Sequence, residues 1–122
     1  MTILYIDDDP EDQEVFRDAV NIVAPHTTCY FARDGKEGFI LLNKITSPPD
    51  YIFLDINMPE MSGKEFLHLI KKNTGLTTTP VIMYSTSNNM DDIREFKQLG
   101  AVDFIVKPNN FSGICDALKR FI

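Results

Sequence analysis

The chain has 122 residues and a formal net charge of −6, with 43% hydrophobic and 25% charged residues. This length fits a single domain, and the composition is ordinary for a soluble globular protein. The negative net charge disfavours direct binding to nucleic acids, whose backbones carry the same charge. The sequence has no apolar run of membrane-spanning length and no basic leader before its first acidic residues, so we expect a cytoplasmic protein.

Short apolar runs alternate with amphipathic stretches along the whole chain. The apolar runs, which we predict to be strands, are residues 3–6, 28–32, 51–54, 81–84 and 102–106. Several are apolar throughout, as in strands that are covered on both faces. The amphipathic stretches that follow predict helices starting near residues 10, 35, 62, 89 and 110. This order predicts repeated βα units around a parallel sheet, in one domain of residues 1–122.

Capping signals support three of these helix starts. Asp9 precedes Pro10, and proline is favoured at the first helical position. Asp34 precedes the second helix, and Ser62 with Glu65 forms a capping-box pattern at the third. The starts follow the predicted strands in turn, as repeated βα units require.

Polar side chains gather where the predicted strands end. The residues after the first, third, fourth and fifth strands are, in that order, Asp7-Asp8-Asp9, Asp55, Ser85-Thr86-Ser87 and Lys107-Pro108. Ligands of open α/β sheets bind beyond the carboxyl ends of the strands. We therefore expect a group of carboxylates, hydroxyls and one amine to meet at a single edge of the sheet.

This set of side chains suits phosphoryl transfer. Two carboxylates about 4 Å apart repel each other by roughly 4 kcal/mol at an effective dielectric constant of about 20, and a divalent cation removes that repulsion. Ligands that are all oxygen favour Mg²⁺ or Mn²⁺. Asp55 can then act as a nucleophile, while Lys107 and a hydroxyl hold the phosphoryl oxygens. Taken singly, each residue also has an ordinary role, such as the helix cap expected of Asp9, so only the combination indicates the site.

Four segments carry a family resemblance: residues 3–9 (ILYIDDD), 54–63 (LDINMPEMSG), 80–85 (PVIMYS) and 100–108 (GAVDFIVKP). With these segments in this order and spacing, the chain resembles the receiver domains of bacterial response regulators over its whole length. The resemblance implies an α/β fold of the CheY-like, flavodoxin-like type. In this fold a doubly wound (βα)5 domain has five parallel strands in the order 2-1-3-4-5.

The resemblance also assigns roles to residues at the strand ends. Asp55 is implied to be the phosphoacceptor, and Lys107 the lysine that contacts the phosphoryl group. The implied metal ligands are Asp8 directly, Asp7 through water, Asp55, and the backbone carbonyl of Asn57. The Lys107–Pro108 peptide is implied to be cis, an energetically mild choice before proline.

Two residues are implied to form a switch. Ser85 matches the hydroxyl that turns toward the phosphoryl group, and Phe104 stands where many receivers have a switch tyrosine. The ring remains at this position but its hydroxyl does not, which puts a switch that relies on a hydroxyl bond in doubt. Thr86 is larger than the small residue often found at its position. We expect Thr86, together with Asn57 and Ser87, to affect access to the acceptor and the rate of reaction.

The predicted function is that of a stand-alone receiver domain in two-component signalling. The domain would accept a phosphoryl group on Asp55 from a sensor histidine kinase or a phosphotransfer protein, with Mg²⁺ or Mn²⁺ bound. It would catalyse only its own phosphorylation and dephosphorylation. Its output would be contact with a protein target through the surface of the fourth helix, fifth strand and fifth helix. We expect a monomer or weak homodimer that binds neither nucleic acid nor membrane.

Two other functions remain open on the sequence. Asp7 and Asp9 imitate the D-x-D nucleophile of haloacid-dehalogenase-like phosphatases, although the chain is short for that class and Asp55 would lack a role. The chain could instead be a receiver-like module that binds proteins without being phosphorylated, although none of the expected site residues is missing. A flavodoxin is disfavoured, because no phosphate-cradling loop follows the first strand.

Overall fold

The structure, a computed structural model, describes residues 1–56, 58, 61–72 and 78–122. Its five parallel strands form one sheet: β1 (Thr2–Ile6), β2 (Thr28–Ala32), β3 (Tyr51–Leu54), β4 (Val81–Ser85) and β5 (Asp103–Val106). Their order across the sheet is β2-β1-β3-β4-β5, which confirms the predicted strand order. Each strand begins and ends within one residue of its predicted bounds.

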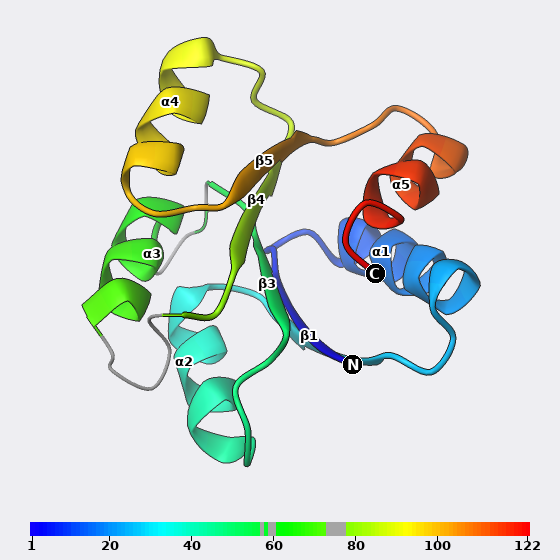
Figure 1. Ribbon diagram of the computed structural model, residues 1–122, viewed down its shortest axis with the longest axis horizontal. Helices are drawn as coiled ribbons and strands as arrows, with labels where there is room; N and C mark the ends of the chain where they lie inside the picture. Colours follow the sequence, from blue (N-terminus) through cyan, green and yellow to red (C-terminus); the bar gives the residue numbers. More distant parts are fainter. Residues whose placement is uncertain (57, 59–60, 73–77) are drawn as a thin grey trace.

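Helices cover both faces of the sheet. In the described part of the chain they are α1 (Pro10–Val23), α2 (Gly35–Lys44), α3 (Gly63–Lys72), α4 (Met90–Gln98) and α5 (Phe111–Leu118). Helices α1 and α5 lie on one face, and α2, α3 and α4 lie on the other (Figure 1). Each helix begins within one residue of its predicted start, so the doubly wound (βα)5 fold is confirmed. Across the described residues, no helix combines the length and apolarity needed to cross a membrane.

The alternation of side chains along the strands divides the core into two layers. On β1, Ile3 and Tyr5 pack toward α1 and α5, whereas Leu4 and Ile6 pack toward the opposite helices. All four side chains are at most 1% exposed. Successive residues of a strand point to opposite faces, so a strand that is covered on both sides needs apolar residues at every position. This packing explains why the strands read as unbroken apolar runs.

Helix α1 begins beside the carboxyl end of β1. The side chain of Asp9 accepts hydrogen bonds from the backbone N–H groups of Glu11 (2.9 Å) and Asp12 (3.4 Å). Pro10 occupies the first helical position, where a backbone N–H would have no partner within the helix, so its absence costs no hydrogen bond. The expected cap is therefore present, and it sets the acidic first turn of α1 at the edge of the sheet where the strands end.

Candidate functional site

The carboxylates of Asp7, Asp8 and Asp55 come together at the ends of β1 and β3. In the parallel register Ile6 pairs with Leu54, so the residues that follow these strands are neighbours. The backbone N–H of Asp55 donates a 3.0 Å hydrogen bond to the carbonyl of Ile6. One oxygen from each carboxylate lies within 4.8 Å of the others, a spacing that suits the oxygen ligands of a divalent cation.

The fourth predicted metal ligand, the backbone carbonyl of Asn57, lies outside the described residues. The structure thus brings together the three carboxylates that the sequence placed at the site and leaves the fourth ligand as a prediction. The D-x-D partner of the phosphatase alternative, Asp9, is exposed and serves as the cap of α1. The side chain of Asp9 therefore has a structural role at the start of α1.

Asp7 is completely buried, and both of its carboxylate oxygens are engaged. Oδ2 accepts a 2.7 Å hydrogen bond from the hydroxyl of Tyr5 and a 2.6 Å bond from Nζ of Lys107. Oδ1 accepts a 3.0 Å bond from the backbone N–H of Asp9. Asp8, in contrast, is exposed. Asp7 is therefore fixed in one orientation, while the carboxylate of Asp8 accepts no hydrogen bond from the residues that the structure describes.

The carboxylate of Asp55 is only 14% exposed. Burial raises the pKa of this carboxyl, and the negative charge of Asp7 acts in the same direction. Lys107 and hydrogen bonds from Ile56 and Ser85 oppose them, and the net result is a pKa of about 6. The backbone N–H of Ile56 lies 2.8 Å from Oδ1 of Asp55. At neutral pH the group is still mostly ionised, so it retains the charge that a nucleophile or metal ligand needs.

Lys107 brings a positive charge to this group from the end of β5. Ser85 pairs with Val106 in the parallel register, and the backbone N–H of Lys107 donates a 2.8 Å bond to the carbonyl of Ser85. Nζ lies 2.6 Å from Asp7, 2.8 Å from Asp12 and 3.9 Å from Asp55. Burial alone would lower the pKa of Lys107, but the hydrogen bonds that its ammonium donates to Asp12 and Asp7 outweigh burial and hold the pKa above its ordinary value. The amine is therefore charged.

Sequence reasoning missed two residues of this cluster, Tyr5 and Asp12. Tyr5 lies inside an apolar strand, where a tyrosine reads as a core residue. Asp12 lies in the acidic first turn of α1, where an aspartate reads as a favourable charge at a helix N-terminus. The only available signal for Tyr5 was its spacing, because a side chain two residues before Asp7 points to the same face of the sheet.

The hydroxyl residues at the end of β4 and just after it lie in different settings. Ser85 is buried, and its Oγ accepts a 3.4 Å hydrogen bond from the backbone N–H of Ser87. Thr86 is exposed. Ser87 donates its own hydroxyl to Asp92 in the first turn of α4, at 2.9 Å. The loop after β4 therefore connects the acceptor region to α4.

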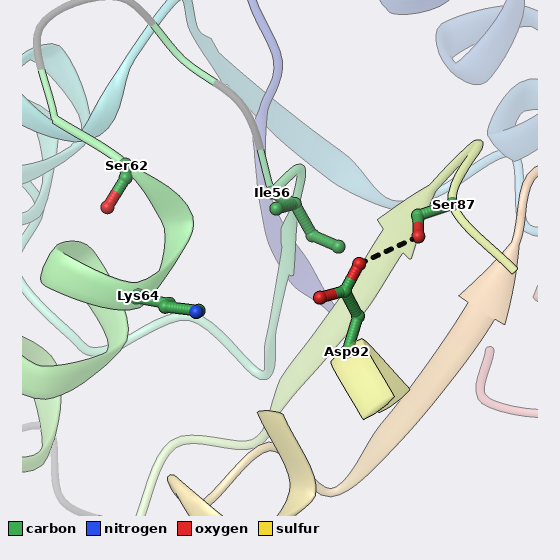
Figure 2. Close-up of a pocket in the computed structure, with 5 residues that line it drawn as sticks. All are labelled: Ile56, Ser62, Lys64, Ser87 and Asp92. Carbon is green, nitrogen blue, oxygen red and sulfur yellow. Dashed lines mark hydrogen bonds between the residues drawn. The ribbon is translucent and has the colours of Figure 1, made fainter. Parts of the chain in front are cut away.

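A groove opens between this loop and α3. It has a volume of about 370 Å³ and is lined by Ile56, Ser62, Lys64, Ser87 and Asp92. Figure 2 shows the Ser87–Asp92 hydrogen bond on one side and the amine of Lys64 extending from α3 on the other. Since Ile56 directly follows Asp55, the groove borders the acceptor. Ser87 lines the same groove, so its position is compatible with the expected effect on access to Asp55.

Two sequence-based expectations concern β5. The ring of Phe104, the predicted switch aromatic, is buried and lies 6.3 Å from the ring of Phe96 on α4, so the inward orientation is the one seen in this structure. The expected cis bond between Lys107 and Pro108 is wrong, because none of the described peptide bonds is cis. The trans form is the lower in energy for a bond before proline, by about 0.5–1 kcal/mol.

Comparison with known families matches residues 3–119 to the response regulator receiver domain. The chain belongs to this family. Receiver domains bind a divalent metal at their acidic pocket and interact with histidine kinases or phosphotransfer proteins and with downstream targets. The domain itself is generally not an enzyme for other substrates. This assignment gives no support to a dehalogenase-like phosphatase or to a module that is never phosphorylated.

A curated relative agrees with the assignment. The probable C4-dicarboxylate response regulator DctR of Bacillus subtilis is 34% identical over 119 residues, which cover 98% of this chain and 51% of that protein. This chain therefore spans about half the length of that relative.

Two solved structures resemble the whole fold. The phosphorylated cyanobacterial phytochrome response regulator RcpA has 31% identity and a TM-score of 0.87, over 98% of this chain and 89% of that one. The Mn²⁺-bound form of the response regulator Rcp1 has 27% identity and a TM-score of 0.84, again over 98% of this chain and 89% of that one. The fold and the receiver class, both predicted from the sequence, are confirmed.

Proposed function

We propose that this receiver domain accepts a phosphoryl group on Asp55 from a sensor histidine kinase or a phosphotransfer protein, in a reaction that requires Mg²⁺. The observation that carries the proposal is the position of the Asp55 carboxylate. It lies within 4.8 Å of carboxylate oxygens of Asp7 and Asp8, and Nζ of Lys107 is 3.9 Å away. A carboxylate in this position can attack phosphorus while positive charge on two sides offsets that of the phosphoryl group.

The side chains present fit a hard divalent cation. Both oxygens of Asp7 already accept hydrogen bonds, so we assign it a contact through water, and we assign direct contacts to Asp8 and Asp55. An all-oxygen set suits Mg²⁺, and Mn²⁺ is the next choice, as in the Mn²⁺-bound form of Rcp1. When bound, the cation neutralises charge that develops on the phosphoryl oxygens. The carbonyl of Asn57 remains a predicted ligand that rests on the family resemblance.

The proposed step transfers a phosphoryl group from a phosphohistidine of the partner to Asp55. A carboxylate oxygen of Asp55 forms a bond to phosphorus as the bond from phosphorus to the histidine nitrogen breaks. That nitrogen keeps the electron pair. Lys107 and the Ser85 hydroxyl donate hydrogen bonds to the phosphoryl oxygens, and such charge-assisted bonds are the stronger ones. Dephosphorylation is attack by water on the same phosphorus, which releases inorganic phosphate and restores the carboxylate.

We propose that the signal leaves through the α4-β5-α5 surface to a protein target. Ser85 ends β4, the strand that pairs with β5, and Phe104 lies on β5 with its ring against Phe96 of α4. The surface exposes apolar side chains from each element, namely Met90 (65% exposed), Val106 (40%) and Phe111 (38%), as a binding surface requires. A monomer or weak homodimer and a cytoplasmic location remain predictions from the sequence.

A small phosphodonor tests the function directly. Acetyl phosphate with Mg²⁺ should add a single acid-stable, base-labile phosphoryl group, detected by intact-protein mass spectrometry. Asp55→Asn should abolish the adduct, whereas Asp116→Asn, which changes an exposed carboxylate on α5, should not. An adduct that survives Asp55→Asn and disappears in Asp7→Ala would move the assignment to a dehalogenase-like nucleophile.

A further inference from the structure

Lys107 is held closer to helix α1 than to the proposed phosphoacceptor. Its Nζ donates a 2.8 Å hydrogen bond to Oδ2 of Asp12 and a 2.6 Å bond to Oδ2 of Asp7. The distance from Nζ to Oδ2 of Asp55 is 3.9 Å, which is beyond hydrogen-bonding range. The lysine side chain is only 11% exposed, so these carboxylates form most of its charged surroundings.

The fold keeps Asp12 in this position. The Asp9 cap and Pro10 fix where α1 begins, and Asp12 lies in the first turn. In the next position, the side-chain amide of Gln13 donates to the backbone carbonyls of Asp7 (2.8 Å) and Ala32 (3.2 Å). These two bonds attach the first turn of α1 to the ends of β1 and β2. Asp12 therefore meets Lys107 from a fixed backbone.

We propose that Asp12 is a positioning residue that acts through Lys107, competing with the phosphoryl group for its ammonium. The inference rests on the proposed function of Asp55. A phosphoryl group on Asp55 adds negatively charged oxygens on the Asp55 side of Nζ, and attraction of the ammonium toward them lengthens its bond to Asp12. The side chain of Asp12 is 38% exposed, so water can solvate it when the lysine leaves. Asp7 is buried and keeps its bond, so Asp12 is the partner that Lys107 releases.

Removal of the competing charge should favour the phosphorylated form. We expect Asp12→Asn to tighten the binding of beryllofluoride, a mimic of the phosphoryl group, by about three- to tenfold at saturating Mg²⁺, given the energies of partly exposed ion pairs. The dissociation constant would be measured by titrating NaF into protein with BeCl₂ and Mg²⁺, following the amide NMR signal of Ser85. Asp12→Ser is a second variant of the same kind, with a side chain that is also well accepted near a helix N-terminus.

Two controls separate a positioning role from a general charge effect. Glu11→Gln removes the same charge from an exposed residue of the same helical turn and should change the affinity by less than about twofold. In a Lys107→Ala background, Asp12→Asn should also change it by less than about twofold, because the two side chains act as a pair. A residue with a merely structural role would show no such dependence on Lys107.

Tighter binding in Asp12→Asn that disappears in the Lys107→Ala background supports the proposal. Unchanged or weaker binding in both Asp12 variants overturns it, as does an equal gain with and without Lys107. If the wild-type protein does not bind beryllofluoride with Mg²⁺ at all, the assignment of Asp55 as acceptor fails, and the role of Asp12 fails with it.

Discussion

The hydroxyl of Tyr5 donates a 2.7 Å hydrogen bond to Oδ2 of Asp7, the same oxygen that accepts from Lys107. Neither Tyr5 nor Asp7 is exposed. Burial, and then the neighbouring charge of Asp7, raises the pKa of the Tyr5 hydroxyl, so it stays protonated and remains a donor. The ring of Tyr5 stacks on Phe16 of α1 with centroids 4.1 Å apart, which holds the hydroxyl in place. A core side chain thus orients an acidic residue of the site.

Tyr5→Phe should weaken the site as well as the fold. The change leaves the ring in the core but removes one hydrogen bond to a buried charged group, so we expect a loss of about 1.5–3 kcal/mol in the free energy of unfolding. Groups that orient metal ligands affect metal affinity, and we expect Mg²⁺ to bind about tenfold more weakly. Urea denaturation and a calorimetric Mg²⁺ titration measure the two effects.

Tyr51→Phe provides the matched control for this change. Tyr51 lies at the start of β3, at the opposite end of the sheet, where its ring packs against Phe121. The same loss of a hydroxyl there should leave Mg²⁺ affinity unchanged. Equal Mg²⁺ affinity in Tyr5→Phe and the wild type would show that Asp7 needs no orientation by Tyr5.

The raised pKa of Asp55 predicts how stability depends on pH. In the metal-free protein the folded state holds this proton up to about pH 6, whereas an unfolded aspartate loses it near pH 4. The folded state therefore binds more protons between these values, and stability falls as the pH rises through this window. Asp55→Asn removes the buried charge. It should stabilise the protein by about 1–3 kcal/mol at pH 7.5, and by much less at pH 4.5.

Denaturation in EDTA at the two pH values checks this prediction. The exposed residue Asp116 supplies the comparison, because Asp116→Asn should change stability little at either pH. If Asp55→Asn raises the free energy of unfolding equally at both pH values, the charge of Asp55 does not destabilise the folded protein.

Mg²⁺ should stabilise the fold, because it offsets the repulsion among the three clustered carboxylates. At a concentration a hundred times the dissociation constant, ligand linkage gives about 2.7 kcal/mol of added stability. The chain has no tryptophan, so a dye-based thermal shift or calorimetry is the suitable measurement. Asp8→Ala should remove most of the shift, and Glu14→Gln, at an exposed position of α1, should preserve it. A wild-type melting temperature that does not respond to Mg²⁺ at low ionic strength would contradict the metal site.

The sequence predicted which residues lie at the carboxyl ends of the strands better than it predicted which of their side chains contact one another. Asp7, Asp55 and Lys107 were predictable because each directly follows an apolar strand, and parallel strands end at a common edge. The bond between Asp12 and Lys107 joins residues 95 positions apart, and it depends on where the first turn of α1 lies relative to the end of β5. Periodicity and capping give the ends of elements, but they do not give that relative position. The Lys107–Pro108 bond was inferred from resemblance alone, and there the inference is wrong.

Two hydrogen bonds connect the end of β4, beside the acceptor, to the first turn of α4. Ser85 accepts a bond from the N–H of Ser87, and the Ser87 hydroxyl in turn donates to Asp92 at 2.9 Å (Figure 2). If Ser85 turns toward a phosphoryl group on Asp55, it changes the position of Ser87, and the Ser87–Asp92 bond passes this change to the first turn of α4. Beryllofluoride with Mg²⁺ should therefore shift the amide NMR signals of residues 90–98, in addition to those near the acceptor.

Ser87→Ala should reduce the shifts in α4 while leaving those near Asp55 in place, and Ser112→Ala, at an exposed position of α5, should reduce neither. A ligand can shift an equilibrium only by its difference in affinity for the two states, so Ser87→Ala should also change the affinity for beryllofluoride. Shifts along α4 that are as large in Ser87→Ala as in the wild type would exclude this route.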